Sequence, residues 1–397
     1  MKKSVRRIVK VFGVLALLII FVIGGWIAYF YFALPPRVVK AGKDIGIADG
    51  ILALPLPEGF QENFEPHIAI DPSDPNHIEV MAQYGIRFGM GGTDMFRWVT
   101  HNGGTSWEGM TLPSVIQGEY GAADPNVAIF SDGRTIFVEL YTIGFSRKLS
   151  FLSLAMSATE KAARRAFKRK SGPLGAPDKV EGPRTQFGLA VFAIDGPDKR
   201  PSEPIIIESS LESGRRQDKN WTAIDDDPDS PFWGSVYVVY NSGEVDLAAK
   251  RLKDDGLRLT VSRDRGESFV KMTDLTESWV WAQAAVRPNG IVDVIYSQLS
   301  NTSSDNATTN LYHRTSNDGG QTFSPGTLIV SEEDRQWYDQ PAITVTPSGN
   351  LFACWVQSSP TAPARVYCSV FNEASGWSPS VPLETEPAEN TEIAYPA

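Results

Sequence analysis

The sequence of 397 residues predicts an all-β protein built from repeated units of short strands. Runs rich in Val, Ile, Tyr, Phe and Trp, separated by Gly, Pro, Asn and Asp, dominate from about residue 65 onward. This is the pattern of strands and turns. A hairpin-like octapeptide occurs three times, and pairs of strand-like runs recur at a nearly regular interval, which indicates internal repeats. A chain of this length can hold two average domains or one large all-β domain.

The N-terminal region predicts a membrane anchor. After a basic tail at residues 1–10, the uncharged run at residues 11–34 would span about 36 Å as a helix, enough to cross a hydrocarbon core of about 30 Å. Positive charges are more numerous before this run than after it, which favours a cytoplasmic N-terminus and an extracytoplasmic body. A cleaved signal peptide is the alternative, although its apolar core is normally shorter. We therefore expect a single-pass signal-anchor helix, a linker at 35–60 and a folded body at 61–397.

The net charge of −10 conceals a segregation of charge along the chain. Residues 1–43 carry eight basic groups and no acids, and residues 147–170 carry eight basic groups and one acid. The rest of the chain therefore holds 21 basic and 46 acidic residues, a net charge of −25. Such an acidic body argues against nucleic acid as a partner, because phosphate groups would repel it.

Three octapeptides, at 100–107, 262–269 and 316–323, share the pattern Ser/Thr-x-Asp/Asn-x-Gly-x-Ser/Thr-aromatic. Each follows a strand-like run, so the pattern predicts a hairpin connection. The Asp or Asn side chain can accept hydrogen bonds from the turn, Gly suits its positive-φ position, and the aromatic ring would fold back onto the sheet. The residues that define the motif are Thr100, Asn102, Gly104, Trp107, Ser262, Asp264, Gly266, Phe269, Ser316, Asp318, Gly320 and Phe323.

Pairs of strand-like runs joined by short loops form a second repeat. They start near residues 65, 124, 219, 282 and 339, so the interval is about 60 residues except for one of about 95. A period of about 60 with four short strands per unit is typical of blades arranged around an axis. The sequence thus predicts a β-propeller of four-stranded blades with an insertion at 145–185.

The octapeptides resemble the Asp-box, or BNR, motif of sialidase-like β-propellers, where it joins the two outer strands of a blade. The resemblance covers about residues 60–390, with a degenerate copy at 371–377 and none in the second unit. It implies six blades, whereas five units are visible. Residues 392–397 resemble the opening of another inner strand, which would make the chain a truncated product. Residues 44–60 could instead complete a sixth blade, or the ring could hold only five.

The insertion contains the one convincing helix of the body, at 149–170. Its basic residues crowd the second half, within 152–170. Close to a membrane anchor, such a helix could lie on anionic lipid. The alternatives are a solvated helix across the propeller edge and a contact with a protein partner.

Polar residues just before the inner strands are the candidates for a binding site, because ligands of propellers usually bind where these strands meet. Converging carboxylates can bind a cation or sugar hydroxyls, or can act as acid and base. Alternatively, each Asp only stabilises a turn. A structural cation in the funnel is conceivable, and no other cofactor is expected. The candidates are Glu65, Asp124, Asp218 and Asp339, with Tyr120 and Tyr338 nearby.

The resemblance to sialidases implies a Tyr nucleophile paired with Glu, an Asp acid/base and three Arg that bind the substrate carboxylate. Arg suits this role because its planar guanidinium can hold both carboxylate oxygens. Arg87, Arg184, Arg287 and Arg335 are available, but none stands in a family-like motif. Catalytic residues are therefore not assigned.

Cys354 and Cys368 lie on consecutive strand-like runs. They form either a cross-strand disulfide, which an extracytoplasmic setting permits, or two buried thiols. The four His residues show no metal-ligand spacing.

We expect a membrane-anchored, extracytoplasmic propeller that binds a glycan or a protein ligand at its axial face. An exo-acting glycoside hydrolase of the sialidase type is the alternative. A receptor or assembly-factor docking platform is the second alternative.

Overall fold

The computed structural model describes most of the chain from residue 62 to residue 383. The described residues are 54, 62–85, 93–112, 119–143, 186–196, 201–210, 215–246, 251–278, 280–299, 309–330, 337–346, 348–359 and 362–383. The chain divides into one unit at Met1–Leu54 and a second at Pro55–Ala397, and every strand belongs to the second unit.

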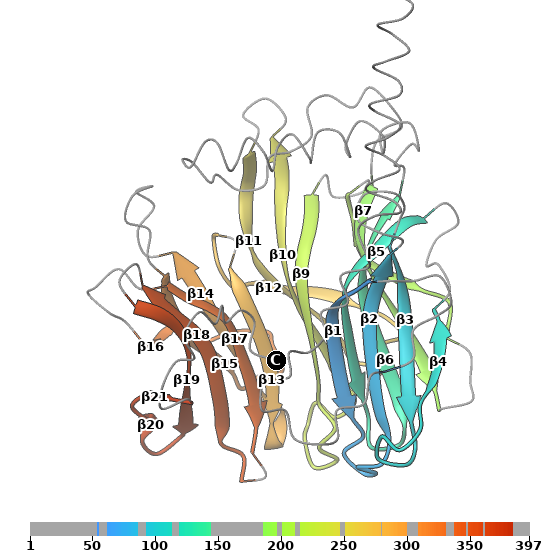
Figure 1. Cartoon of the computed structure of the whole chain (residues 1–397). Coiled ribbons are helices and arrows are strands. Elements are labelled where there is room, and N and C mark those ends of the chain that lie inside the picture. Colours follow the sequence, from blue (N-terminus) through green and yellow to red (C-terminus); the bar gives the residue numbers. More distant parts are fainter. Residues whose placement is uncertain are drawn as a thin grey trace, which may run out of the picture. The chain divides into compact units, whose positions relative to one another are not determined.

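Five antiparallel sheets follow one another along the chain as the blades of a β-propeller (Figure 1). Blade 1 contains β1 (Glu62–Ile70), β2 (Ile78–Gly85), β3 (Thr93–Thr100) and β4 (Glu108–Thr111). Blade 2 contains β5 (Glu119–Ile129), β6 (Arg134–Ile143), β7 (Gln186–Asp195) and β8 (Ile205–Ser209). Blade 3 contains β9 (Arg215–Ile224), β10 (Val236–Asp246), β11 (Arg251–Ser262) and β12 (Val270–Asp274). Blade 4 contains β13 (Trp281–Arg287), β14 (Ile291–Leu299), β15 (Thr309–Ser316) and β16 (Thr327–Val330). Blade 5 contains β17 (Trp337–Val345), β18 (Leu351–Ser359), β19 (Ala362–Asn372), β20 (Gly376–Trp377) and β21 (Val381–Pro382).

The first strand of each blade lies at the axis, and β1, β5, β9, β13 and β17 each contact the next in this order. In blades 2, 3 and 4 the second strand is covered on both faces by neighbouring blades, which permits a continuously apolar run rather than an alternating one. In β10 the run at 236–240, Val-Tyr-Val-Val-Tyr, is almost completely buried. The core therefore consists of apolar clusters between successive blades.

The predicted strand pairs and the five repeated units are confirmed as five blades, four of them four-stranded and the fifth with the additional short strand β21. A sixth blade, which the family resemblance implied, is not among the described residues. The anchor at 11–34, the linker at 35–60, the insertion at 145–185 and its basic helix also lie outside them, apart from Leu54. Within the described ranges, no helix is long and apolar enough to cross a membrane.

The three octapeptides join β3 to β4, β11 to β12 and β15 to β16. In each copy the first hydroxyl accepts a hydrogen bond from the Gly N–H, at 3.1 Å in the first copy and 2.8 Å in the others. The Asn or Asp oxygen accepts from the backbone N–H four residues later, at 2.8–2.9 Å. The shared glycine has a φ of 88° to 90°, a left-handed conformation that favours Gly. The repeat thus forms one and the same turn three times, at the outer edges of blades.

Blade 5 has no full octapeptide, and its strands β18 and β19 are joined by a disulfide. Cys354 and Cys368 face each other directly in the register of these strands. Their sulfur atoms are bonded to each other in the structure. Of the two alternatives that the sequence left open, the structure therefore has the disulfide and not two buried thiols.

Candidate functional site

Three consecutive inner strands share one backbone irregularity. The strand register shifts at Glu65 in β1, at Asp124 in β5 and at Lys219 in β9. All three residues have positive φ, at 50°, 49° and 47°. A non-glycine residue in this region costs about 1–3 kcal/mol, and such residues concentrate at functional sites. The chain therefore carries the same conformational strain at three equivalent positions around the axis.

The side chains of these residues meet in one charged group. The Lys219 ammonium donates to Glu65 Oε1 at 2.7 Å and to Asp124 Oδ1 at 2.8 Å. The backbone N–H of Lys219 donates to Asp124 Oδ2 at 3.0 Å, and Gln83 Nε2 donates to Glu65 Oε2 at 3.0 Å. A single ammonium group thus connects three inner strands.

Asp218 lies beside this group and completes what we term the inner-strand cluster, consisting of Glu65, Asp124, Asp218 and Lys219. One Asp218 oxygen accepts from the backbone N–H of Lys219 at 3.1 Å, and the other lies 3.6 Å from the Arg216 guanidinium. The ring centroid of Trp281, the first residue of β13, lies 5.5 Å from Lys219 Nζ. An aromatic ring therefore borders the charged group on the side of blade 4.

The two carboxyl groups that Lys219 pairs with, those of Glu65 and Asp124, differ in their pKa values. Burial, together with hydrogen bonding to Asp124 and the charge of Asp124, raises the pKa of Glu65 to about 7. Burial opposes ionisation of Asp124, but its hydrogen bond with Glu65 and the charge of Lys219 lower its pKa. For Lys219, burial is outweighed by the two carboxylates, so its pKa is raised. Near neutral pH, Lys219 and Asp124 are ionised and Glu65 can gain or lose a proton, as a general acid or base must.

Asp218 differs from Asp124 although they are close. Burial and the negative charge of Asp124 raise the pKa of Asp218, against the effects of Arg216 and Lys219. The positive charges that act on the cluster from described residues thus come from Lys219 and Arg216. When all three acids of the cluster are ionised, their three negative charges outnumber these two positive charges.

The structure brings together Glu65, Asp124 and Asp218 from the candidates that the sequence offered. Tyr120 lies on β5, and Tyr338 and Asp339 lie on β17, but the described structure does not include their side chains. A fourth register shift occurs in β17, just after Asp339. Lys219 is not among the candidates from the sequence, which are acids and tyrosines. Alignment of the strand pairs would have revealed it, since it occupies the position of Glu65 and Asp124.

Side chains at equivalent positions of the inner strands, which in β1, β5 and β9 lie two residues beyond the shift, bind each inner strand to the next. His67, Asn126 and Gln283 accept hydrogen bonds from the backbone N–H of the following inner strand, at 3.3, 3.0 and 3.0 Å. Trp221 occupies the equivalent place on β9 and donates to the Ala284 carbonyl at 3.1 Å. Burial lowers the pKa of His67 to about 4, so its ring stays neutral and can accept this bond. These contacts fix the positions of the inner strands relative to one another along the axis, and they thereby fix the geometry of the cluster.

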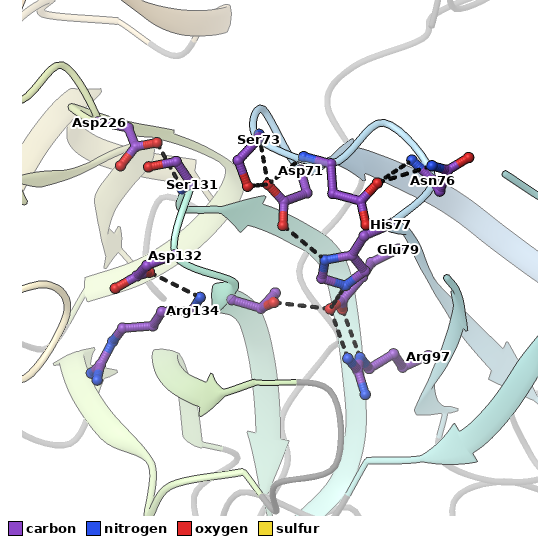
Figure 2. A network of polar contacts seen from close by, with 12 residues as sticks. Asp71, Ser73, Asn76, His77, Glu79, Arg97, Ser131, Asp132, Arg134 and Asp226 are labelled. Atoms are coloured by element: carbon purple, nitrogen blue, oxygen red, sulfur yellow. Dashed lines mark hydrogen bonds and ion pairs between the residues drawn. The ribbon is translucent and has the colours of Figure 1, made fainter. Parts of the chain in front are cut away.

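A second polar network lies between blades 1 and 2 and is closed to solvent (Figure 2). Arg97 donates to both Glu79 oxygens, at 2.6 and 2.7 Å. His77 lies between Asp71 and Glu79, at 3.1 and 3.2 Å, and Thr135 of blade 2 donates to Glu79 at 2.9 Å. Every member has a partner within the protein, so this network stabilises the seam between blades and is not a binding site.

Arg287, one of the four arginines considered for a carboxylate-binding triad, is likewise committed to structure. Its guanidinium is buried and donates to Asp293 at 2.6 Å and to Glu373 at 3.1 Å. It thus binds the second strand of its own blade and the edge of blade 5. Arg87, Arg184 and Arg335 lie outside the described residues.

No metal site is evident in the part of the chain that the structure describes. None of its groups of three or more His, Cys, Asp or Glu side chains is arranged to hold a metal ion. In the inner-strand cluster the position between the Glu65 and Asp124 carboxylates is filled by the Lys219 ammonium.

Comparisons with known proteins find solved structures that are similar to the chain only at low identity. No protein-family model and no curated protein matches the chain. A solved structure of a protein of unknown function from Dyadobacter fermentans DSM 18053 is similar at 14% identity and a TM-score of 0.49, over 84% of this chain and 85% of that one. The Hadza microbial sialidase Hz136 is similar at 13% identity and a TM-score of 0.48, over 82% of this chain and 59% of the sialidase. An α-L-arabinanase from Penicillium chrysogenum, solved with arabinobiose, is similar at 12% identity and a TM-score of 0.45, over 79% of this chain and 78% of that one. At these values no family and no activity is assigned to the chain.

Proposed function

We propose that this protein is a membrane-anchored, extracytoplasmic β-propeller that binds a glycan at its axial face, through the inner-strand cluster. One observation carries the proposal. Three consecutive inner strands each adopt a strained backbone, and the residues at these positions direct their charged side chains to a single point. Strain repeated at one point is more readily explained by a site than by the stability of the separate blades.

The chemistry of the cluster suits a sugar. Carboxylates accept hydrogen bonds from hydroxyl groups, an ammonium donates to them, and charge-assisted bonds of this type are about twice as strong as neutral ones. The cluster is also reachable, since the side chains of Glu65, Asp218 and Lys219 are 43%, 32% and 27% exposed. The Trp281 ring adds an aromatic surface next to the polar groups.

The charges favour a ligand without a carboxylate. Two basic groups face three acids in and around the cluster, and both basic groups already contact an acid. Recognition of a carboxylate normally uses Arg in a bidentate arrangement. We therefore propose a neutral, hydroxyl-rich glycan rather than an acidic sugar as the ligand.

A glycan array probed with the full-length protein tests this proposal. Lys219→Met and Asp124→Asn each remove charge-assisted hydrogen bonds worth about 1.5–3 kcal/mol, so we expect affinity to fall roughly 10- to 150-fold. Lys271→Met is the matched control, because Lys271 pairs with Asp274 on the exposed outer strand β12 of blade 3. Absence of any bound glycan, or equal binding by Lys219→Met and wild type, would refute the proposal.

Glycoside hydrolysis is the second candidate, favoured by the separated pKa values of Glu65 and Asp124. Enzymes of this type pair a protonated carboxylic acid with an ionised carboxylate. If Glu65 is the acid, the rate must fall as the pH rises through about 7, because the protonated form is then lost. A panel of chromogenic glycosides assayed between pH 5 and 9 tests this. Activity that persists in Glu65→Gln would exclude Glu65 as the acid.

The cellular setting is part of the proposal. We place residues 11–34 across a membrane, with residues 1–10 in the cytoplasm, and the basic segment 152–170 against anionic lipid. Protease treatment of sealed cells tests the orientation. If the body is extracytoplasmic, protease added outside the cells should cleave it. The docking-platform alternative would gain support if one stoichiometric membrane protein were captured by the full chain and no glycan were bound.

A further inference from the structure

The loop at 225–234, which joins β9 to β10, carries an exposed tryptophan. Trp233 is 50% exposed, whereas large aromatic residues are mostly buried in folded proteins. Its backbone N–H donates to the Ser230 carbonyl at 3.2 Å, and the N–H of Gly234 donates to the Asp225 carbonyl at 2.8 Å. The Ser230 hydroxyl donates to the Asp225 carboxylate at 2.5 Å. The loop is therefore held by its own hydrogen bonds and presents Trp233 on an ordered support.

Arg265 links Trp233 to blade 2 in a stack of aromatic and cationic groups. Its guanidinium carbon lies 4.8 Å from the centre of the Phe130 ring and 5.6 Å from the centre of the Trp233 ring. Its Nη2 group lies 2.6 Å from both oxygens of Asp132. A cation placed over an aromatic ring at such distances is attracted to the ring. Trp233 is thus the exposed end of a stack that begins at Phe130.

A comparison of the three octapeptides shows that Arg265 is present for its side chain. It is the fourth residue of the second copy and has a φ of 61°, whereas the first and third copies have Gly103 and Gly319 at this position, with φ of 65° and 70°. Glycine adopts this left-handed conformation readily, but a residue with a Cβ adopts it only at a cost in free energy. The turn itself forms with glycine in the other two copies, so it does not require Arg. We therefore attribute Arg265 to its contacts with Trp233, Phe130 and Asp132.

We propose that this surface, termed the Trp233 surface and consisting of Asp132, Arg265 and the loop at 225–234, binds a basic segment of a partner protein, with an arginine side chain stacked on Trp233. A guanidinium stacks on aromatic rings more readily than other cationic side chains, and Trp is the best ring for this contact. A partner arginine on the exposed part of Trp233 would continue the alternation of ring and cation that begins at Phe130. Tryptophan and arginine are also the residues that most often dominate the binding energy of protein interfaces.

The charges around the ring favour a basic partner. The loop, Arg265 and the ion pairs around it comprise seven acids and three arginines. Figure 2 shows one of these acids, Asp226, which accepts from the backbone N–H of Ser131 at 2.7 Å in the turn that also carries Asp132. An excess of acids attracts a cationic segment and steers it to the surface, whereas a neutral sugar would not respond to it. The acids are Asp132, Asp195, Asp225, Asp226, Asp227, Asp229 and Glu267, and the arginines are Arg134, Arg263 and Arg265.

The Trp233 surface is separate from the inner-strand cluster. Lys219 lies five residues before the end of β9 at Ile224, and the loop at 225–234 follows that end. At about 3.3 Å per residue, the surface therefore begins roughly 16 Å from the cluster along the strand. A ligand at the cluster and a partner segment at Trp233 can consequently be tested independently.

Binding of defined peptides to the full-length protein, followed by fluorescence anisotropy, tests this inference. The peptides share one Gly/Ser frame and carry Arg, Lys, Gln or Glu at the same positions. We expect the Arg peptide to bind most tightly and the Lys peptide more weakly, because a compact ammonium group does not stack as a guanidinium does. The Gln and Glu peptides should not bind.

Substitutions locate the peptide site. Trp233→Ala should weaken binding of the Arg peptide roughly 10- to 30-fold, the loss typical of a tryptophan that dominates an interface. Trp233→Phe keeps an aromatic ring and should lose less. Leu328→Ala is the matched control, because it truncates an apolar side chain that is 41% exposed on the outer strand β16. Lys219→Met alters the inner-strand cluster and should bind the peptide like wild type.

Three results would overturn the inference. Equal binding of the Arg peptide by Trp233→Ala and wild type would show that Trp233 is not part of the site. Equal binding of the Arg and Gln peptides would show that the partner need not be basic. Glycan binding that Trp233→Ala abolishes, without binding of any peptide, would assign the Trp233 surface to a sugar.

Discussion

Replacing Glu79 by Gln should destabilise the protein strongly, although the change removes no volume. The Glu79 and Arg97 side chains are each only 1% exposed, and two hydrogen bonds of 2.6 and 2.7 Å connect them (Figure 2). In Glu79→Gln the guanidinium stays buried without a counter-charge, and the new amide group presents a donor where an acceptor is required. Loss of one partner of a buried ion pair costs about 3–5 kcal/mol.

Two further substitutions calibrate this value. Thr135→Val removes one hydrogen bond to the same ionised carboxylate, so we expect a loss of about 1.5–3 kcal/mol. Glu267→Gln alters an acid that is 70% exposed and lies 3.7 Å from Arg134, and exposed pairs contribute about 0–1 kcal/mol. The predicted order of destabilisation is therefore Glu79→Gln first, Thr135→Val second and Glu267→Gln last.

Urea unfolding of the full-length variants, followed by tryptophan fluorescence, measures the free energies. The reasoning would be refuted if Glu79→Gln cost no more than Glu267→Gln. That result would mean that Arg97 is hydrated or that the seam between blades 1 and 2 rearranges to provide another acceptor.

Three other predictions concern the turns, the disulfide and pH. Gly320→Ala should cost clearly more free energy of unfolding than Gly133→Ala, because both have positive φ but an added Cβ meets Leu259 at 2.7 Å only at Gly320; equal costs would contradict the packing. Reduction of the Cys354–Cys368 disulfide, separated by 14 residues, should lower the free energy of unfolding by about 3 kcal/mol, and an unchanged denaturation midpoint in dithiothreitol would contradict this. The hydrogen bond to Glu79 raises the pKa of His77 against the effect of burial, so its stabilising contribution is full below about pH 6.5 and is lost as the pH rises through the raised pKa. The stability difference between wild type and His77→Gln should therefore shrink from pH 6 to pH 9, and a difference that grows over this range would reverse the assigned sign.

Much of the fold follows from local patterns in the sequence. The octapeptides determine turns through contacts within eight residues, so their hydroxyl, carboxylate and glycine positions can be predicted without knowledge of the rest. The continuous apolar run of β10 likewise reports burial on two faces directly. The number of blades is harder to predict from the sequence. It depends on which segments pack against the faces of blades 5 and 1, and such long-range packing is not encoded in a local pattern.

Membership of the inner-strand cluster follows only in part from the sequence. Asp124 and Asp218 were expected near the axis because they precede or open inner strands, and the structure places both in the cluster. Lys219 was not expected, since its role arises from residues 95 and 154 positions away in the sequence. The register shift at Lys219 is a property of strand pairing, and the residue itself has no conformational preference that would reveal it.

Titration calorimetry of the full-length protein with the glycan that binds best on the array tests the central claim most directly. The inner-strand cluster as a binding site predicts saturable binding by wild type and Lys271→Met, and affinity reduced roughly 10- to 150-fold in Lys219→Met. Equal affinity in all three proteins, with the fold of Lys219→Met intact by circular dichroism, would contradict it.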